Sequence, residues 1–325
     1  MARTASKPAA SKRVTPALAE RFAAELARLW PEGGRLGLAV SGGPDSLALL
    51  VLAEKVLPGR FEVATVNHGL RPEAAAECDL VARACAERGA ACEILSVTVN
   101  AGNVQSAARE ARYFALAAWA ETRGLSAVAT AHHADDQAET LLMRLNRSSG
   151  LAGLAGVREA SSVPTFDTPL IRPLLRFRRS ELALVVEEAG LTAVQDPSNL
   201  DDRFDRPRIR KALGTCDWLD PLALTASAAH LADADEAIEY AFRLLWNERV
   251  AQNGDELRYR PSVPKTIELR IVQRAILSLG KQTRGQDVAR LVERLQTGES
   301  GNLGGVLVTA EGDEWVFRPE PPRRG

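Results

Sequence analysis

A glycine-rich hexapeptide between two apolar runs places the strongest constraint on how this chain can fold. It consists of Ser41, Gly42, Gly43, Pro44, Asp45 and Ser46. The apolar runs on either side cover residues 36–40 and 47–51. A strand that turns through glycines into a helix directs backbone N–H groups and the positive end of the helix dipole at one point, where a phosphate can bind. The segment therefore predicts a phosphate-binding loop between a strand and a helix.

Three side chains of the hexapeptide suit such a loop. Ser46 can cap the helix, and Pro44 fits its first turn. Asp45 would repel a phosphate unless a metal ion lay between them. No lysine occurs between Arg35 and Lys55, so the Gly-Lys-Ser/Thr ending of the other common phosphate loop is absent. The alternative is a plain glycine-rich turn, which would have no need of Asp45.

The first half of the chain alternates between strand-like apolar runs and longer helical patterns. Strands are predicted at 36–40, 61–66, 92–99 and 126–131, and helices at 44–56, 72–88, 104–123 and 134–145. This alternation predicts an α/β fold with a doubly wound parallel sheet. In the usual strand order 3-2-1-4, ligands bind at the switch point between the first and fourth strands, so the segments that follow those strands should face one another.

The segment after the fourth predicted strand supplies a second group of polar residues, His132-His133-Ala134-Asp135-Asp136-Gln137-Ala138-Glu139-Thr140. Asp136 and Glu139 are three apart and share a helix face, so they could hold magnesium or transfer protons beside the phosphate loop. We predict Asp45, Asp136 and Glu139 as the acids of one centre, with Asp45 and Asp136 as metal ligands. Zinc is disfavoured because adjacent histidines project in different directions and no third ligand has a suitable spacing.

Further residues are expected to border the same site. Asn67 and His68 follow the second strand and could frame an adenine or its ribose, and His132 follows the fourth strand. Arg112 shares a face of the third predicted helix with Arg109. The two arginines form either a solvated basic face or, through Arg112, a clamp for phosphate or carboxylate.

The pattern changes after residue 147, which suggests a second domain. We predict a basic flexible tail over 1–19, a catalytic domain over 20–213 and a mainly helical domain over 214–325. Residues 215–300 have a helical composition rich in Ala, Leu and Glu, and the segments 306–309 and 314–318 predict a small terminal hairpin.

Composition indicates the cellular compartment in which the protein works. No run approaches the roughly 18 consecutive apolar residues that a membrane-spanning helix needs. The four cysteines form no Cys-x-x-Cys pair, so neither a zinc knuckle nor a disulfide framework is indicated. We expect a cytoplasmic protein without a membrane partner.

Several motifs together make the chain resemble the tRNA(Ile)-lysidine synthetase family of the ATP-pyrophosphatase superfamily. They are Ser-Gly-Gly-Pro-Asp-Ser at 41, Val-Asn-His-Gly-Leu-Arg at 66, Ala-Arg-Tyr at 111, His-His-Ala-Asp-Asp-Gln-Ala-Glu-Thr at 132, Arg-Pro-Leu-Leu at 172, Asp-Pro-Ser-Asn at 196 and Arg-Pro-Arg-Ile-Arg at 206. One departure is Arg147-Ser148-Ser149-Gly150, where the family usually has Arg-Gly-Ser-Gly.

The resemblance implies a carbon–nitrogen ligase that uses ATP and Mg²⁺. In such enzymes C2 of cytidine 34, in the CAU anticodon of tRNA(Ile), is adenylated with loss of pyrophosphate. The ε-amine of free L-lysine then displaces AMP and gives lysidine. By motif position, the resemblance places Asp45, Asp136, Glu139 and Arg112 in the catalytic centre, without dividing the roles among the three acids.

Two local basic runs stand out against a net charge of −1. They are Arg172, Arg176, Arg178 and Arg179, and then Arg203, Arg206, Arg208, Arg210 and Lys211. We expect Arg206, Arg208, Arg210 and Lys211 to contact tRNA, because single-stranded RNA is bound through its phosphates and splayed bases. The alternative is a solvated helix start that pairs with nearby aspartates. A homodimer is compatible with the sequence.

Two other functions are considered. A tRNA thiolase of the same superfamily usually needs paired cysteines or an iron–sulfur cluster, and the spacing of Cys78, Cys85, Cys92 and Cys216 offers neither. A nucleotide-binding module without catalysis would tolerate loss of Asp45, Asp136 and Glu139, all of which are present.

Overall fold

The computed structural model describes residues 14–69, 74–98, 104–194, 203 and 205–320. Residues 1–13 of the predicted tail and the Asp-Pro-Ser-Asn motif at 196 lie outside the described residues. The chain divides into two compact units, Met1–Ala232 and Asp233–Gly325, each of which is described by itself. The division falls inside helix α9 (Pro221–Arg249), later than the predicted boundary at residue 213.

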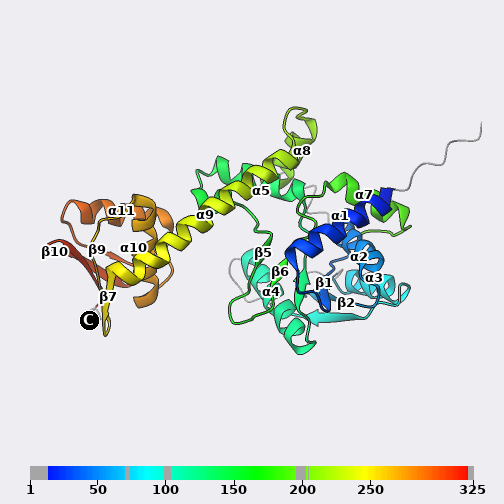
Figure 1. Ribbon diagram of the computed structural model, residues 1–325, viewed down its shortest axis with the longest axis horizontal. Coiled ribbons are helices and arrows are strands. Elements are labelled where there is room, and N and C mark those ends of the chain that lie inside the picture. The colour runs from blue at the N-terminus through cyan, green and yellow to red at the C-terminus, as the bar shows by residue number, and fades with distance from the viewer. Residues whose placement is uncertain (1–13, 70–73, 99–103, 195–202, 204, 321–325) are drawn as a thin grey trace, which may run out of the picture. The chain divides into compact units, whose positions relative to one another are not determined.

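The first unit alternates strands and helices in the predicted order (Figure 1). Its strands are β1 (Leu36–Ala39), β2 (Phe61–Asn67), β3 (Cys92–Ser96), β4 (Ala127–Ala129), β5 (Ala160–Ser161) and β6 (Leu170–Ile171). Its helices are α1 (Val14–Leu29), α2 (Pro44–Val56), α3 (Ala74–Ala86), α4 (Val104–Thr122), α5 (Ala134–Asn146), α6 (Leu151–Leu154), α7 (Arg179–Glu188), α8 (Asp205–Thr215) and the first part of α9.

The strand order of the six-stranded sheet is β3-β2-β1-β4-β6-β5. All neighbouring pairs are parallel except β5 with β6 at the edge. The predicted order 3-2-1-4 and the doubly wound parallel sheet are therefore confirmed. The loops after β1 and β4 meet at the switch point, because these two strands are direct neighbours.

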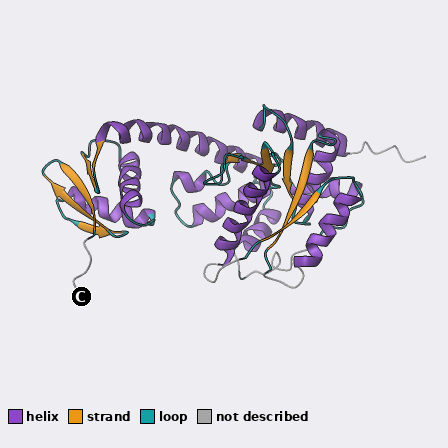
Figure 2. Ribbon diagram, turned by 90° about the horizontal axis from the view of Figure 1, so that it is seen from below, coloured by secondary structure: helices purple, strands orange, loops and turns teal. Residues whose placement is uncertain are grey.

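The sheet carries a separate apolar core on each face, as the two-residue period of a strand requires. Leu38, Val63 and Ala129 belong to the larger core, which α1, α2, α3 and α7 complete. Ala64 and Val128, on the opposite face, pack against α4. Figure 2 shows the strands of this unit with helices around them. The sheet is thereby held on both sides, which fixes the carboxyl ends of its strands.

The N-terminal helix α1 begins at Val14, so the predicted flexible tail over 1–19 is too long at its C-terminal end. Leu18, Phe22 and Leu26 recur at helical spacing and are buried in the larger core. The basic composition of the first residues concealed this apolar stripe. The helix packs against α2 and α7.

The link after α5 contains the departure from the family pattern. Ser148 has a φ of 52°, a left-handed conformation that favours glycine. A serine therefore adopts the backbone conformation for which relatives usually have a glycine.

The second unit combines helices with a five-stranded sheet. Its further helices are α10 (Lys265–Leu279) and α11 (Gly285–Gln296), and its strands are β7 (Val250–Asn253), β8 (Glu256–Tyr259), β9 (Gly301–Leu303), β10 (Val306–Glu311) and β11 (Glu314–Pro319). The strand order is β7-β8-β11-β10-β9, and every neighbouring pair is antiparallel.

The predicted terminal hairpin is present as β10 and β11, which pair from Glu311 with Glu314 outward. The prediction of helices throughout 215–300 was wrong at β7 and β8, where the chain turns at Gly254 with φ 58°. On α11, Val288, Leu291, Val292 and Leu295 form one buried stripe against this sheet's core. Among the described residues, none of the helices has the length and apolar character needed to cross a membrane.

Candidate active site

The hexapeptide forms a tight turn between β1 and α2. Gly43 is the N-cap of α2 and supplies no side-chain cap, so the first N–H groups of the helix are not covered by a capping side chain. Ser46 does not cap the helix as predicted. Its hydroxyl instead accepts a hydrogen bond from the Ser41 N–H at 3.1 Å and donates one to the Gly43 carbonyl at 2.9 Å. The turn is thus closed internally, and its helix start is left available for an anion.

Gly42 is the position in this turn that requires glycine. Its φ is 84°, and a Cβ there would lie 3.2 Å from Cγ2 of Val194. The Gly42 carbonyl also accepts a hydrogen bond from the Val194 N–H at 2.9 Å. The loop is therefore held against the segment that follows α7.

A cavity of about 790 Å³ opens beside this loop at the switch point of the sheet. Nine of the predicted site residues line it: Ser41, Gly43, Pro44, Asp45, Ser46, His68, Arg112, His132 and Asp136. The prediction that the segments after β1 and β4 face one another is thereby borne out in the geometry. Asn67 and Glu139 are not among the lining residues, and the Asn67 side chain accepts a hydrogen bond from the Gly69 N–H at 2.9 Å.

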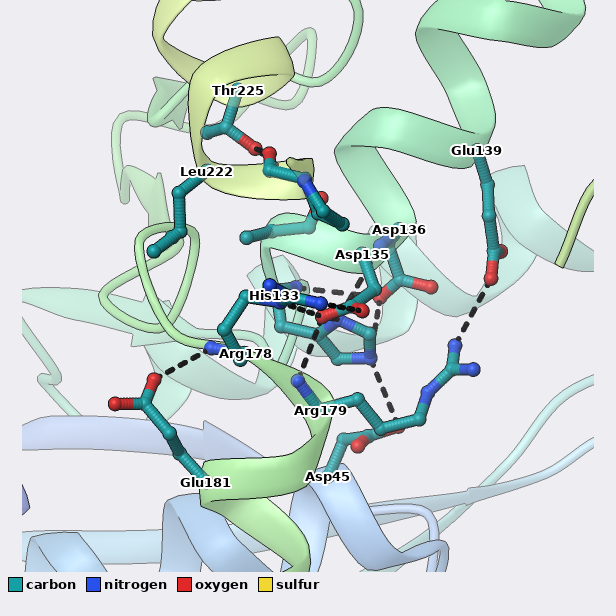
Figure 3. Close-up of polar contacts among 12 residues, drawn as sticks. Asp45, His133, Asp135, Asp136, Glu139, Arg178, Arg179, Glu181, Leu222 and Thr225 are labelled. Atoms are coloured by element: carbon teal, nitrogen blue, oxygen red, sulfur yellow. Dashed lines mark hydrogen bonds and ion pairs between the residues drawn. The ribbon is translucent and has the colours of Figure 1, made fainter. Parts of the chain in front are cut away.

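Asp45 and Asp136 meet at a buried imidazole (Figure 3). Nε2 of His133 lies 3.4 Å from a carboxylate oxygen of Asp45 and 3.4 Å from one of Asp136. On the other side of the ring, Nδ1 accepts a hydrogen bond from the Asp136 N–H at 3.3 Å, so the proton of a neutral ring would be on Nε2. The imidazole therefore joins the carboxylates of two motifs that are far apart in sequence.

The charge state of His133 follows from these contacts. Burial lowers the pKa of His133, but the nearby carboxylates of Asp45 and Asp136 outweigh burial and raise the pKa above its ordinary value. Sequence reasoning did not select His133 as a site residue. Its place directly after a buried strand, beside the selected His132, was the available signal.

Glu139 is 1% exposed and lies among three guanidinium groups. Nε of Arg206 is 2.8 Å from Oε2, Nε of Arg210 is 2.7 Å from Oε1, and a terminal nitrogen of Arg179 is 3.2 Å from Oε1. Arg206 also reaches Oδ1 of Asp136 at 2.8 Å. Helix α8 is therefore fastened to α5 through two of the residues that were predicted to contact tRNA.

The arginines determine the ionisation of Glu139. Burial raises the pKa of this carboxyl, but the hydrogen bonds and charges of Arg210 and Arg206 outweigh burial and give a net lowering. Glu139 is thus held as a carboxylate that is already neutralised by its neighbours.

Asp135 links the start of α7 to the carboxylates and the imidazole around His133. One of its oxygens accepts a hydrogen bond from the Arg179 N–H at 2.7 Å and lies 3.4 Å from Nε of Arg178. Glu181 completes the helix start by accepting a hydrogen bond from the Arg178 N–H at 2.8 Å (Figure 3). Asp135, Arg178 and Arg179 were not predicted as site residues.

The arginines of the first basic run form hydrogen bonds and ion pairs within the chain. Arg172 is buried and donates to the Arg158 carbonyl at 2.7 Å, while Arg176 pairs with Glu159 at 3.2 Å. Together with the contacts of Arg178 and Arg179, these leave no uniform basic surface along this run. In the second run, Arg208 is 67% exposed and pairs only weakly, at 3.9 Å, with Asp205.

Arg112, His68 and His132 contribute a cationic group and two imidazoles to the lining of the cavity. Burial, followed by the charges of Arg172 and Arg109, lowers the pKa of His132 well below its ordinary value. Burial and the charge of Arg112 likewise lower the pKa of His68. Within the described part of the chain, no carboxylate pairs with Arg112. These three residues therefore offer a guanidinium and two uncharged imidazoles to an anionic ligand.

The residues present fit a magnesium ion. Oδ1 of Asp45 is buried and has no hydrogen-bond partner among the described residues. Those residues contain no group of three or more metal-binding side chains. Asp45 and Asp136, which both line the cavity, are the carboxylates that would hold the ion. Mg²⁺ usually binds one or two carboxylates and completes its coordination with water and substrate phosphate oxygens.

The fold and the site together define a class of protein, an α/β domain with a glycine-rich loop at the switch point of a parallel sheet. The family described as PP-loop domain matches residues 15–216. Among solved structures, the U34-tRNA thiolase NcsA from Methanococcus maripaludis, with its [4Fe-4S] cluster, is similar with a TM-score of 0.55 and 17% identity, covering 70% of this chain and 85% of that one. This likeness shows a shared fold.

Full-length relatives give the particular family. The chain is 48% identical to a tRNA(Ile)-lysidine synthase of Novosphingobium aromaticivorans, over 94% of this chain and 95% of that protein. It is 40% identical to a tRNA(Ile)-lysidine synthase of Zymomonas mobilis, over 90% and 91% of the two chains. The chain belongs to the tRNA(Ile)-lysidine synthase family, and the thiolase alternative is not favoured.

Proposed function

We propose that this chain converts cytidine 34 in the CAU anticodon of tRNA(Ile) into lysidine, using ATP and free L-lysine. The observation that carries the proposal is the 48% identity to a tRNA(Ile)-lysidine synthase over 94% of the chain. The convergence of Asp45, Asp136, Arg112 and His132 on one cavity supports it.

The reaction has two steps. The C2 oxygen of the cytidine attacks the α-phosphorus of ATP, an O–P bond forms, and pyrophosphate leaves. The ε-amine of lysine then attacks C2 and loses a proton, and the bond from C2 to the adenylate oxygen breaks to release AMP. The first step develops charge on phosphoryl oxygens, and the second needs an uncharged amine.

The residues of the cavity are suited to these demands. The uncapped start of α2 and Arg112 would hold the phosphates, and His68 and His132 would border the nucleotide. Asp45 and Asp136 would hold Mg²⁺, which would neutralise phosphate charge when bound. The same two carboxylates line the cavity, where either could take the proton of the lysine amine.

Glu139 has a different part in this proposal. It holds Arg206 and Arg210 against the acids, so those two arginines would contact tRNA only after leaving Glu139. Arg208 and Lys211 are exposed on α8 and would meet the tRNA backbone directly. The four cysteines are free thiols, which suits the cytoplasm, where we place the reaction. A homodimer stays a prediction that sedimentation can test.

The deciding experiment is incorporation of labelled lysine. The protein is incubated with ATP, Mg²⁺, radiolabelled lysine and a transcript of the isoleucine tRNA with a CAU anticodon, beside a methionine tRNA with the same anticodon. We expect label in the isoleucine tRNA alone, together with release of AMP and pyrophosphate. Absence of label from both transcripts would contradict the proposal.

A further inference from the structure

A single tryptophan stands out on the surface of the first unit. Trp218, between α8 and α9, is 79% exposed. Three of the other tryptophans, Trp30, Trp119 and Trp315, are at most 8% exposed, and Trp246 is partly buried. An exposed indole leaves a large apolar surface in water, and such residues are common where another molecule is bound.

The corner that displays Trp218 is fixed by hydrogen bonds. Asp220 accepts from the Leu222 N–H at 3.0 Å and pairs with Arg178 at 3.4 Å. One turn further along α9, the Thr225 hydroxyl lies 2.8 Å from the Pro221 carbonyl oxygen and 3.2 Å from the Ala134 carbonyl oxygen at the start of α5. Trp218 is therefore held at the end of the unit where α5 presents its acids.

Helix α8, which leads to Trp218, carries exposed positive charge, and Asp217 stands between this helix and the indole in the sequence. On α8, Arg206 and Arg210 face Glu139, whereas Arg208 and Lys211 are exposed. Arg208 and Lys211 are three apart, so they share the outer face of the helix that leads to Trp218. An aromatic ring beside exposed cations is the combination that binds single-stranded RNA, since bases stack on the ring while cations contact phosphates.

We propose that Trp218 is a stacking platform for an unpaired base of the RNA substrate, next to the nucleotide that enters the cavity. The inference rests on the proposed function for the identity of that RNA. Trp218 is not among the residues that line the cavity, so its effect should fall on RNA binding and on placement of the target base.

Tryptophan fluorescence tests the contact directly. The difference between the spectra of wild type and Trp218→Phe gives the signal of Trp218, because the other four tryptophans are present in both proteins. Those four are more buried and should therefore be less accessible to a quencher. Adding the isoleucine tRNA transcript should shield this signal from acrylamide. A signal that stays equally accessible at saturating tRNA overturns the proposal.

Binding measurements give the size of the effect. Stacking of one base contributes about 1–3 kcal/mol by alanine substitution, so Trp218→Ala should raise the Kd for tRNA between about 5-fold and about 150-fold. Trp218→Phe, which keeps an aromatic face, should stay within about threefold of wild type. Leu184→Ala, at a 41% exposed leucine on α7, is the matched control and should bind as wild type does. Binding of ATP should not change in any variant.

The remaining outcomes separate this inference from its alternatives. Equal tRNA affinity for Trp218→Ala and wild type overturns the proposal. A difference in sedimentation between Trp218→Ala and wild type in the absence of RNA also overturns it, because it would assign Trp218 to contact with a second copy. If wild type incorporates no lysine while Trp218→Ala still weakens RNA binding, the proposed function fails and the stacking contact stands.

Discussion

The carboxylates of the site lie in two different electrostatic settings. Asp45 and Asp136 share one imidazole at the wall of the cavity, although Arg206 also reaches Asp136, whereas Glu139 is enclosed by three guanidinium groups away from that wall. A carboxylate with little compensating charge can still bind a metal ion or a proton, and one that is already neutralised cannot do so without losing its partners. We therefore expect Asp45 and Asp136 to serve the proposed reaction and Glu139 to hold α8 in place, and the variants below test this division.

The largest effect should come from Asp45→Asn, which removes the charge and keeps the size of the side chain. We expect lysine incorporation to fall about 1,000-fold or more, because charge on the phosphoryl oxygens would lose its main counterbalance. Circular dichroism and urea unfolding should match wild type. Asp217→Asn, at an exposed aspartate of the α8–α9 corner, is the control and should retain activity. Near-normal activity of Asp45→Asn would remove this residue from the reaction.

The main effect of Glu139→Gln should be a loss of folding stability rather than a direct effect on the reaction. Breaking a buried ion pair usually costs 3–5 kcal/mol, and the partial exposure of the arginines favours a loss of about 3 kcal/mol here. Urea unfolding measures the loss directly. A variant as stable as wild type but without activity would instead place Glu139 among the reacting groups and would undo the comparison.

His133→Gln tests whether the imidazole positions the two aspartates. The ring is fully buried and contacts both carboxylates, so its loss should let them separate. Groups that orient metal ligands typically contribute 10- to 100-fold, and we expect a fall in lysine incorporation of about that size, with a higher Mg²⁺ requirement. His230→Gln, at an exposed histidine of α9, should have no effect. An unchanged Mg²⁺ requirement would argue against positioning.

Local signals made much of the first unit predictable. Helix α2 has the bounds that were predicted, because Pro44 and the glycines mark its start within a few residues of sequence. The order of the first four strands matched the order that is usual in doubly wound parallel sheets. In the second unit, β7 and β8 were missed, since their segments are short and adjoin a long Ala- and Leu-rich helix whose composition dominated the window.

In the site too, only the features that follow from the sequence or the strand order were predictable. The meeting of Asp45 with Asp136 followed from the switch-point rule, which depends on strand order alone. The contact of Arg206 and Arg210 with Glu139 spans about seventy residues of sequence and depends on where α8 packs. A run of arginines has the same sequence pattern whether it faces solvent, RNA or a buried carboxylate. Only the packing of α8 on α5 distinguishes these cases.

The smallest effect concerns the pH dependence of stability. The pKa of Glu139 is lowered in the folded protein, so its ion pairs stabilise the fold at pH values above the pKa of an unfolded glutamate and cease to do so as the pH falls through the lowered value. Wild type should therefore be more stable than Glu139→Gln at neutral pH, and the gap in unfolding free energy should narrow steadily in acid. Urea unfolding of both proteins between about pH 7 and pH 3 measures it. A gap that does not narrow would mean that the variant loses packing rather than charge pairing. The contrast between the two groups of carboxylates would then depend only on the observation that Asp45 and Asp136 line the cavity and Glu139 does not.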